Sequence, residues 1–136
     1  MILVDTSVWI DYLGSNETEA STILDGLLTR GVPTGLTSLI YQELLQGTSS
    51  EETFDTLKSY LDTQIFYHPQ DSWASYANAA ALYAQCRRAG ITLRSTVDCL
   101  IAQIAIENGL WLQHNDKDFD RMAQVVSDLQ LFENKA

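Results

Sequence analysis

The chain has 136 residues and a net charge of −10, which fits one domain with a proper core and argues against binding a polyanion through its whole surface. No apolar run reaches the length of a membrane span, and no basic signal-peptide region precedes the first strand. The two cysteines form no disulfide framework. We therefore expect a cytoplasmic protein with reduced thiols.

The first predicted element is a short strand, Ile2-Leu3-Val4, which is fully apolar as strands of a buried parallel sheet are. Asp5 ends this strand, and a helix beginning VWIDYL follows at once. Asp5 has two interpretations at this point: it caps the helix, or it is a functional acid at the carboxyl end of a strand. A second helix beginning near Thr18 and a second strand over Thr34–Thr37 come next.

The third predicted helix, LIYQELLQG, follows Ser38 as its expected N-cap and carries one acid on its apolar side. On a helical wheel Glu43 falls between Leu39 and Leu44, inside the apolar arc. A carboxylate there needs a partner, and its side chain leans back toward the start of the helix and the same sheet edge. The alternative is a glutamate that simply reaches into solvent.

Residues 49–89 are predicted to form two helices and one short strand. The pattern gives an acidic amphipathic helix over 49–63, a brief strand over Gln64–Tyr67 and a long alanine-rich helix over Asp71–Ala89. The aromatic residues of the long helix are expected in the core or in a dimer contact. Arg87 and Arg88 at its end suit the helix dipole.

The stretch from Ser95 to Phe119 does most to define the protein. Ser95 begins a segment with the form of a capping box, and the helix behind it is apolar nearly all round, so we expect it inside the protein. The helix from Asp98 to Asn108 rises about 16 Å, and a strand over Leu110–His114 returns about the same distance. Asp116 therefore comes back level with Asp98.

These two acids also have simpler interpretations. Asp98 could be a first-turn acid favoured by the helix dipole, and Asp116 could cap the last helix, predicted over Asp118–Val126. A possible edge strand follows at Leu129–Phe132. The alternation of strands and helices over residues 1–136 predicts a single α/β domain with a short, mainly parallel sheet and helices on both faces.

Four acids from separate strand–helix units should meet at one sheet edge: Asp5, Glu43, Asp98 and Asp116. Such a group repels itself unless a cation joins it, and carboxylate oxygens select a hard ion such as Mg²⁺ or Mn²⁺. The chain has no Cys/His spacing typical of zinc sites. The pattern suits metal-assisted hydrolysis of phosphodiesters.

At the level of motifs, the chain resembles PIN-domain ribonucleases, and more narrowly the VapC toxins of bacterial toxin–antitoxin pairs. The motifs are ILVDTSVWIDYL, GITLRSTVDCLIAQIA and LQHNDKDFDRMA. The resemblance implies a PIN-like three-layer α/β/α fold and a Mg²⁺- or Mn²⁺-dependent endoribonuclease. It places the metal at Asp5, Asp98 and Asp116, with Glu43 orienting water. Thr6 and Ser7 match polar residues beside the first acid, and Asp118 could share or take the role of Asp116.

The same resemblance implies an RNA substrate, a cognate antitoxin protein and a homodimer, with no membrane attachment. Six of the eight basic residues fall in the last third of the chain, most of them flanking Ser95–Phe119. The candidates to position RNA phosphates are Arg87, Arg88, Arg94, Lys117 and Arg121. Two alternatives stay open: a non-catalytic RNA- or protein-binding module on the same fold, and a metal-dependent nuclease that cuts DNA.

Overall fold

The computed structural model describes residues 1–133, built around a four-stranded parallel sheet in the order β3-β2-β1-β4. The strands are β1 (Ile2–Val4), β2 (Thr34–Leu36), β3 (Ile65–Phe66) and β4 (Trp111–Gln113). Every residue of β1 and β2 is buried, as expected for central strands covered on both faces. Because all four strands run the same way, their carboxyl ends lie along one edge of the sheet.

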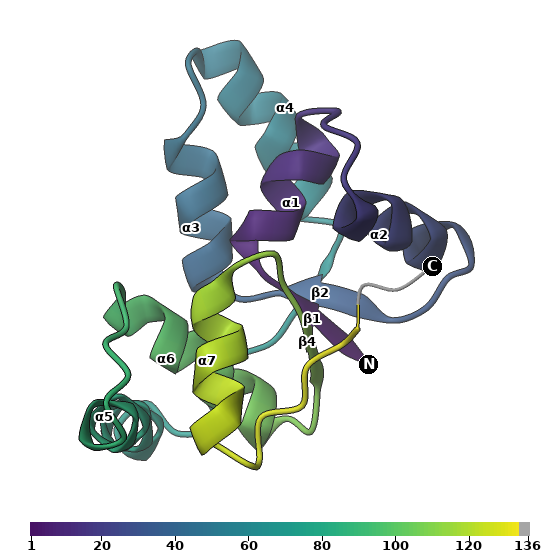
Figure 1. Cartoon of the computed structure of the whole chain (residues 1–136). Coiled ribbons are helices and arrows are strands. Elements are labelled where there is room, and N and C mark those ends of the chain that lie inside the picture. The colour runs from purple at the N-terminus through teal and green to yellow at the C-terminus, as the bar shows by residue number, and fades with distance from the viewer. Residues whose placement is uncertain (134–136) are drawn as a thin grey trace.

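Seven helices connect and cover the strands among the described residues: α1 (Thr6–Leu13), α2 (Glu19–Thr29), α3 (Ser38–Gln46), α4 (Glu51–Leu61), α5 (Ala74–Arg88), α6 (Thr96–Glu107) and α7 (Lys117–Val125). In Figure 1, α1 and α2 lie above the sheet, and α5 and α6 lie below it. The three-layer α/β/α fold predicted from the sequence is confirmed.

Helix α6 provides much of the core, as its apolar sequence predicts. Residues Cys99 to Ala105 are all buried, and α5 packs along the helix. Burial of each large apolar side chain stabilises the fold by roughly 1.5–3 kcal/mol, which explains why a helix of this composition lies inside. Within residues 1–133, no helix combines the length and apolar character needed to cross a membrane.

Several predicted element ends shift because side chains cap the chain in other places. Thr37, not Ser38, is the N-cap of α3, and its Oγ1 accepts from the N–H of Ile40 at 3.1 Å. Ser95 caps α6 through the N–H of Val97, one position short of the capping box that was expected. Helix α5 begins at Ala74 because the Asp71 carboxylate accepts from the N–H groups of Trp73 and Ala74.

The expected edge strand over Leu129–Phe132 is present only as a single parallel bridge between Leu131 and Leu112. The backbone of Leu112 donates to Gln130 at 2.9 Å and accepts from Phe132 at 2.8 Å. Because β4 is only three residues long, it offers room for little more pairing than this. The chain after α7 therefore passes along the outer side of β4.

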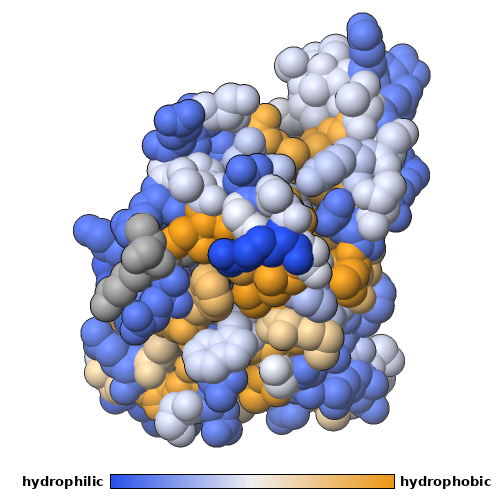
Figure 2. Space-filling model, turned by 90° about the vertical axis from the view of Figure 1, so that its right-hand side faces the viewer, coloured by the Kyte–Doolittle hydropathy of each residue, from blue (hydrophilic) through white to orange (hydrophobic). Residues whose placement is uncertain are grey.

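The opposite edge of the sheet, where the strands begin, is apolar. Figure 2 shows hydrophobic residues near the middle of one face of the molecule, with one strongly hydrophilic residue lying across them and other hydrophilic residues around. A pocket of about 450 Å³ at the strand starts is lined by Met1, Ile2, Val32, Trp111, Leu131, Phe132 and Glu133. Any site built from the predicted acids must therefore lie at the other edge, where the strands end.

The close approach of β3 to β2 makes Gly35 a sensitive position. A Cβ on Gly35 would collide with the backbone oxygen of Ile65 and with the ring of Tyr67. We expect Gly35→Ala to destabilise the fold by about 1–3 kcal/mol, as overpacking does. Urea denaturation will measure this change.

Gly26 in the middle of α2 is the matched control, because an added Cβ there meets nothing within 4 Å. Gly26→Ala should stabilise the protein by about 0.5–1 kcal/mol, since alanine favours the helix over glycine. Equal denaturation midpoints for Gly35→Ala and the wild type would contradict the packing argument.

Candidate active site

Asp5 ends β1 and is fixed in place at the sheet edge. Its carboxylate is 5% exposed and accepts at Oδ2 from the Ser7 backbone N–H at 3.1 Å and from Ser7 Oγ at 2.7 Å. Ser7 Oγ in turn accepts from the N–H of Asn115, beyond β4, at 2.9 Å. Asp5 therefore caps α1, which is the first of the two interpretations of this residue. The same hydrogen bonds from Ser7 hold the Asp5 carboxylate beside the end of β4.

Burial raises the pKa of Asp5 above its ordinary value, although the hydrogen bonds from Ser7 oppose the shift. The negative charge of Asp116 adds to the increase. A cap residue on the surface has no such neighbours. The second interpretation of Asp5, a member of a group of acids, is thus compatible with its role as a cap.

Glu43 reaches the same edge from α3. Its Oε1 accepts a hydrogen bond from Thr6 Oγ1 at 3.2 Å. Partial desolvation raises the pKa of Glu43, the bond from Thr6 lowers it, and the charge of Asp5 raises it further. The side chain is exposed, so the expectation that Glu43 lies inside the apolar arc is wrong: the buried side of α3 is formed by Ile40, Leu44 and Leu45.

Asp98 lies in the first turn of α6, and its pKa shows how closely the acids gather. Burial raises the pKa of Asp98 to about 7, and the charges of Asp5, Asp116, Glu43 and Asp118 all contribute. A carboxylate beside other carboxylates is harder to ionise, because like charges at short range repel. The structure therefore brings Asp5, Glu43, Asp98 and Asp116 into one electrostatic neighbourhood, where the sequence predicted that they would meet.

Asp116 caps α7, and its carboxylate is also held by an arginine. Asp116 Oδ1 accepts from the N–H of Asp118 at 3.0 Å and from Arg94 Nη2 at 2.9 Å. Its backbone N–H donates to His114 Nδ1 at 3.1 Å. The capping interpretation of Asp116 is correct, and the same residue faces the acids of β1 and α6.

Asp118 differs from the other acids because arginines occupy both of its oxygens. Its side chain is 1% exposed; Oδ2 accepts from Arg94 Nε at 3.1 Å, and Oδ1 accepts from Arg121 Nη1 at 3.2 Å. Burial would raise the pKa of Asp118, but the hydrogen bonds from Arg94 and the charges of both arginines hold it below its ordinary value. These contacts favour Asp116 over Asp118 as the acid that serves the site.

The donor set suits a hard divalent cation, although the side chains do not yet converge on one point. Carboxylate oxygens are the preferred ligands of Mg²⁺ and Mn²⁺, and such a cation would offset the repulsion that raises the pKa of Asp98. In the part of the chain from 1 to 133, no three His, Cys, Asp or Glu side chains are arranged to hold one ion. The carboxylate oxygens of these residues are suitable ligands for a metal ion. The Asp116 side chain, however, is bound to Arg94.

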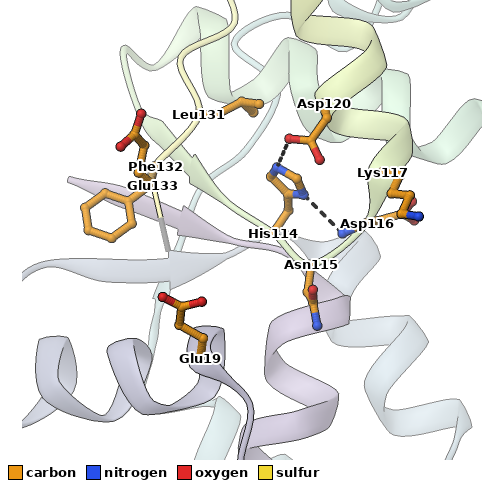
Figure 3. Close-up of a pocket in the computed structure, with 9 residues that line it drawn as sticks. All are labelled: Glu19, His114, Asn115, Asp116, Lys117, Asp120, Leu131, Phe132 and Glu133. Atoms are coloured by element: carbon orange, nitrogen blue, oxygen red, sulfur yellow. Dashed lines mark hydrogen bonds and ion pairs between the residues drawn. The ribbon is translucent and has the colours of Figure 1, made fainter. Parts of the chain in front are cut away.

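A pocket of about 690 Å³ adjoins Asp116 on the side of the carboxyl-terminal segment. Figure 3 shows the His114 ring between Asp120 and the backbone of Asp116, with Glu19 of α2 across the pocket. The remaining lining residues are Asn115, Lys117, Leu131, Phe132 and Glu133. His114 is not among the residues predicted for the site; the structure buries it, with Nε2 3.3 Å from Asp120 Oδ1, where it supports the turn that carries Asp116.

The predicted phosphate-binding residues fall into two groups. Arg94, Lys117 and Arg121 lie around Asp116 and Asp118, at the rim of the acid cluster. Arg87 and Arg88 are in the last turn of α5, and residues 89–95 connect this turn to the start of α6. The Arg87 guanidinium lies 5.8 Å from the centre of the Tyr83 ring.

Comparison with known proteins agrees with this arrangement. The family model described as PIN domain matches residues 2–125. The chain is 34% identical over 128 residues to VapC ribonuclease Mb1587 of Mycobacterium bovis and to ribonuclease VapC11 of Mycobacterium tuberculosis, covering 93% of this chain and 95% of each relative.

Solved structures share the fold at low sequence identity. A chain of VapBC2 from Rickettsia felis, solved bound to a DNA fragment from its promoter, superposes with a TM-score of 0.74 at 20% identity, covering 97% of this chain and 98% of that one. A chain of VapBC-1 from nontypeable Haemophilus influenzae gives 0.72 at 19% identity and covers 98% of both. Together with the sequence matches, these show that the chain belongs to the PIN-domain family, among the VapC ribonucleases.

Proposed function

We propose that this protein is the endoribonuclease toxin of a toxin–antitoxin pair and cuts RNA with the help of Mg²⁺ or Mn²⁺ at Asp5, Asp98 and Asp116. The observation that carries the proposal is the neighbourhood of four acids at the carboxyl edge of the sheet, seen in the raised pKa of Asp98. The chain belongs among the VapC ribonucleases, and this membership supports RNA as the substrate.

Each acid has a separate task in the proposed reaction. Asp5 is held by two hydrogen bonds from Ser7, so its carboxylate needs little reorganisation before it binds a cation. Asp98 must be ionised to bind the cation. A cation held by these acids would lower the pKa of water and neutralise charge that develops on the phosphate.

Glu43 is placed to handle the proton of the attacking water. Its carboxylate is exposed and is oriented by Thr6, and its raised pKa moves it toward the working range of a general base. Glu43 therefore orients the water and takes up its proton, while Asp5 and Asp98 keep their negative charges for the cation.

The basic residues around the acids are proposed to bind RNA phosphates. A chain with a net charge of −10 attracts RNA only where positive charges are gathered. Arg94, Lys117 and Arg121 border the acid cluster, and Arg87 and Arg88 precede the loop to α6. Guanidinium groups bind phosphate oxygens in pairs, so the arginines can hold the RNA backbone in register.

We propose two protein partners for this chain, in the cytoplasm. The similar solved structures include VapBC complexes, which supports a cognate antitoxin for this chain. A homodimer is proposed through α5, where Tyr76 is 53% exposed and lines an apolar groove of about 410 Å³. Trp73, just before α5, is 86% exposed. Aromatic residues of this kind are frequent in the centres of protein interfaces.

The proposed function is tested by incubating the purified protein with total cellular RNA and, separately, with single-stranded DNA of matched length. We expect cleavage of RNA with Mg²⁺ or Mn²⁺, loss of cleavage with a chelator and its return when metal is added back. Mapping the new ends will identify the cut sites. RNA that is bound but left intact would instead support a binding module, and cleavage of DNA alone would support a deoxyribonuclease.

A further inference from the structure

The guanidinium of Arg94 lies between two acids that the site uses differently. Nη2 is 2.9 Å from Asp116 Oδ1, and Nε is 3.1 Å from Asp118 Oδ2. The backbone N–H of Arg94 donates to the same Asp118 oxygen at 3.2 Å. One residue in the loop before α6 therefore connects both acids at the start of α7 with the helix that carries Asp98.

The two ends of this guanidinium differ in how firmly they are held. Asp118 is 1% exposed and is bound at its other oxygen by Arg121, so the contact with Nε is anchored. Asp116 is 26% exposed, and the side chain of Arg94 is 74% exposed. The Nη2 contact is therefore the one that can open while Arg94 stays attached to Asp118.

Arg94 occupies one of the two Asp116 oxygens that could bind a cation. Asp116 Oδ1 already accepts from Arg94 and from the N–H of Asp118. A guanidinium and a divalent cation cannot both use this oxygen fully, because each needs its lone pairs and the two positive charges repel.

We propose that Arg94 is a positioning residue that holds Asp116 until a divalent cation takes its place. The inference rests on the proposed metal-dependent function. Before the cation binds, the guanidinium balances the charge of Asp116 and limits the repulsion that Asp98 feels. A cation at these acids would compete with Arg94 for Asp116, and Arg94 would stay attached through Asp118.

The test is calorimetric titration of the purified protein with Mn²⁺ at pH 7.5, without RNA. Arg94→Ala removes the competing guanidinium, so we expect Mn²⁺ to bind about 3- to 10-fold more tightly, the range for losing one exposed ion pair and one nearby positive charge. Arg94→Gln keeps a polar side chain and the backbone bond to Asp118 and should show the same direction. It serves as the measurement if the alanine variant does not fold.

Arg121→Ala is the matched control. It removes the other guanidinium from Asp118 and leaves the bond between Arg94 and Asp116 in place. Its affinity for Mn²⁺ should stay within about twofold of the wild type, because the Asp116 oxygen is still occupied. A purely structural role for Arg94 would weaken metal binding in the two Arg94 variants and leave Arg121→Ala unchanged.

The outcomes separate this inference from the proposed function. Tighter binding of Mn²⁺ by the Arg94 variants, but not by Arg121→Ala, supports the exchange of Arg94 for a cation at Asp116. This holds also when the wild type binds Mn²⁺ too weakly to measure. Equal or weaker binding in the Arg94 variants, with clear binding by the wild type, overturns the exchange and leaves the metal-dependent function standing. Binding by none of the proteins overturns both.

Discussion

Substituting Asp98 by asparagine should reduce RNA cleavage by about 10²- to 10³-fold while the fold is retained. The change keeps the size of the side chain and removes the charge that a cation requires, and losing one preorganised electrostatic group of this kind costs about 10²–10³ in rate. Asp5→Asn should have an effect of the same order. The double variant should be little worse than either single one, because residues that act as one unit are not additive.

The measurement is initial cleavage rate of an RNA substrate at saturating Mg²⁺, with circular dichroism to verify the fold. Asp55→Asn is the matched control, because Asp55 is an exposed acid on α4. It should keep wild-type activity. An Asp98→Asn variant that cuts RNA at the wild-type rate would contradict the metal-dependent mechanism.

The second large effect concerns stability and pH in the absence of metal. The pKa of Asp98 is about 7 in the folded protein and near 3.8 in the unfolded chain. Between these values the folded state binds more protons than the unfolded one, so raising the pH lowers the stability. The raised pKa values of Asp5 and Glu43 act in the same direction.

We expect the melting temperature of the metal-free protein to fall as the pH rises from 5 to 7.5. Because Asp98 is only half-buried, its share is discounted to roughly 1–2 kcal/mol, or about 3–8 °C. Asp98→Asn should therefore melt higher than the wild type at pH 7.5, with a smaller difference at pH 5. Saturating Mg²⁺ should raise the melting temperature of the wild type by mass action and that of the variant by much less.

The range from pH 5 to 7.5 avoids a second group of acids with the opposite behaviour. Ion pairs or hydrogen bonds hold the pKa values of Asp62, Asp71, Glu107 and Asp118 below their ordinary values. Their stabilising effect is lost as the pH falls through those lowered values, below about pH 4. Superimposable pH profiles for the wild type and Asp98→Asn would show that the acids do not interact.

The sequence by itself determined the order of the elements and the edge at which the acids meet. Short strands that alternate with helices permit little other than a parallel sheet with covered faces. In that arrangement Asp5 follows β1 directly, Asp116 lies a few residues beyond β4, and Asp98 is in the first turn of a buried helix. That these acids come to the same edge of the sheet follows from the rise per residue of the helix and the strand that connect them. This estimate needs no knowledge of distant contacts.

Positions that depend on a distant partner could not be obtained in this way. Glu43 was expected inside the apolar arc of its helix, but the neighbours of α3 leave it exposed, with Thr6 as its partner. Gly35 has no special place in the strand pattern, and only the approach of Ile65 makes it necessary.

The tertiary structure alone decided how the charges of the site are paired. Arg94 lies 22 residues before Asp116 and 24 before Asp118, and it meets them because the loop before α6 packs against the start of α7. From the sequence Asp116 was the predicted ligand, and Asp118 was an additional residue that could share or take its role. The fold separates them, because two arginines bind the buried Asp118 and one guanidinium reaches the more exposed Asp116. Periodicity reports which side of an element faces the core, whereas ion pairing depends on which elements the fold brings together.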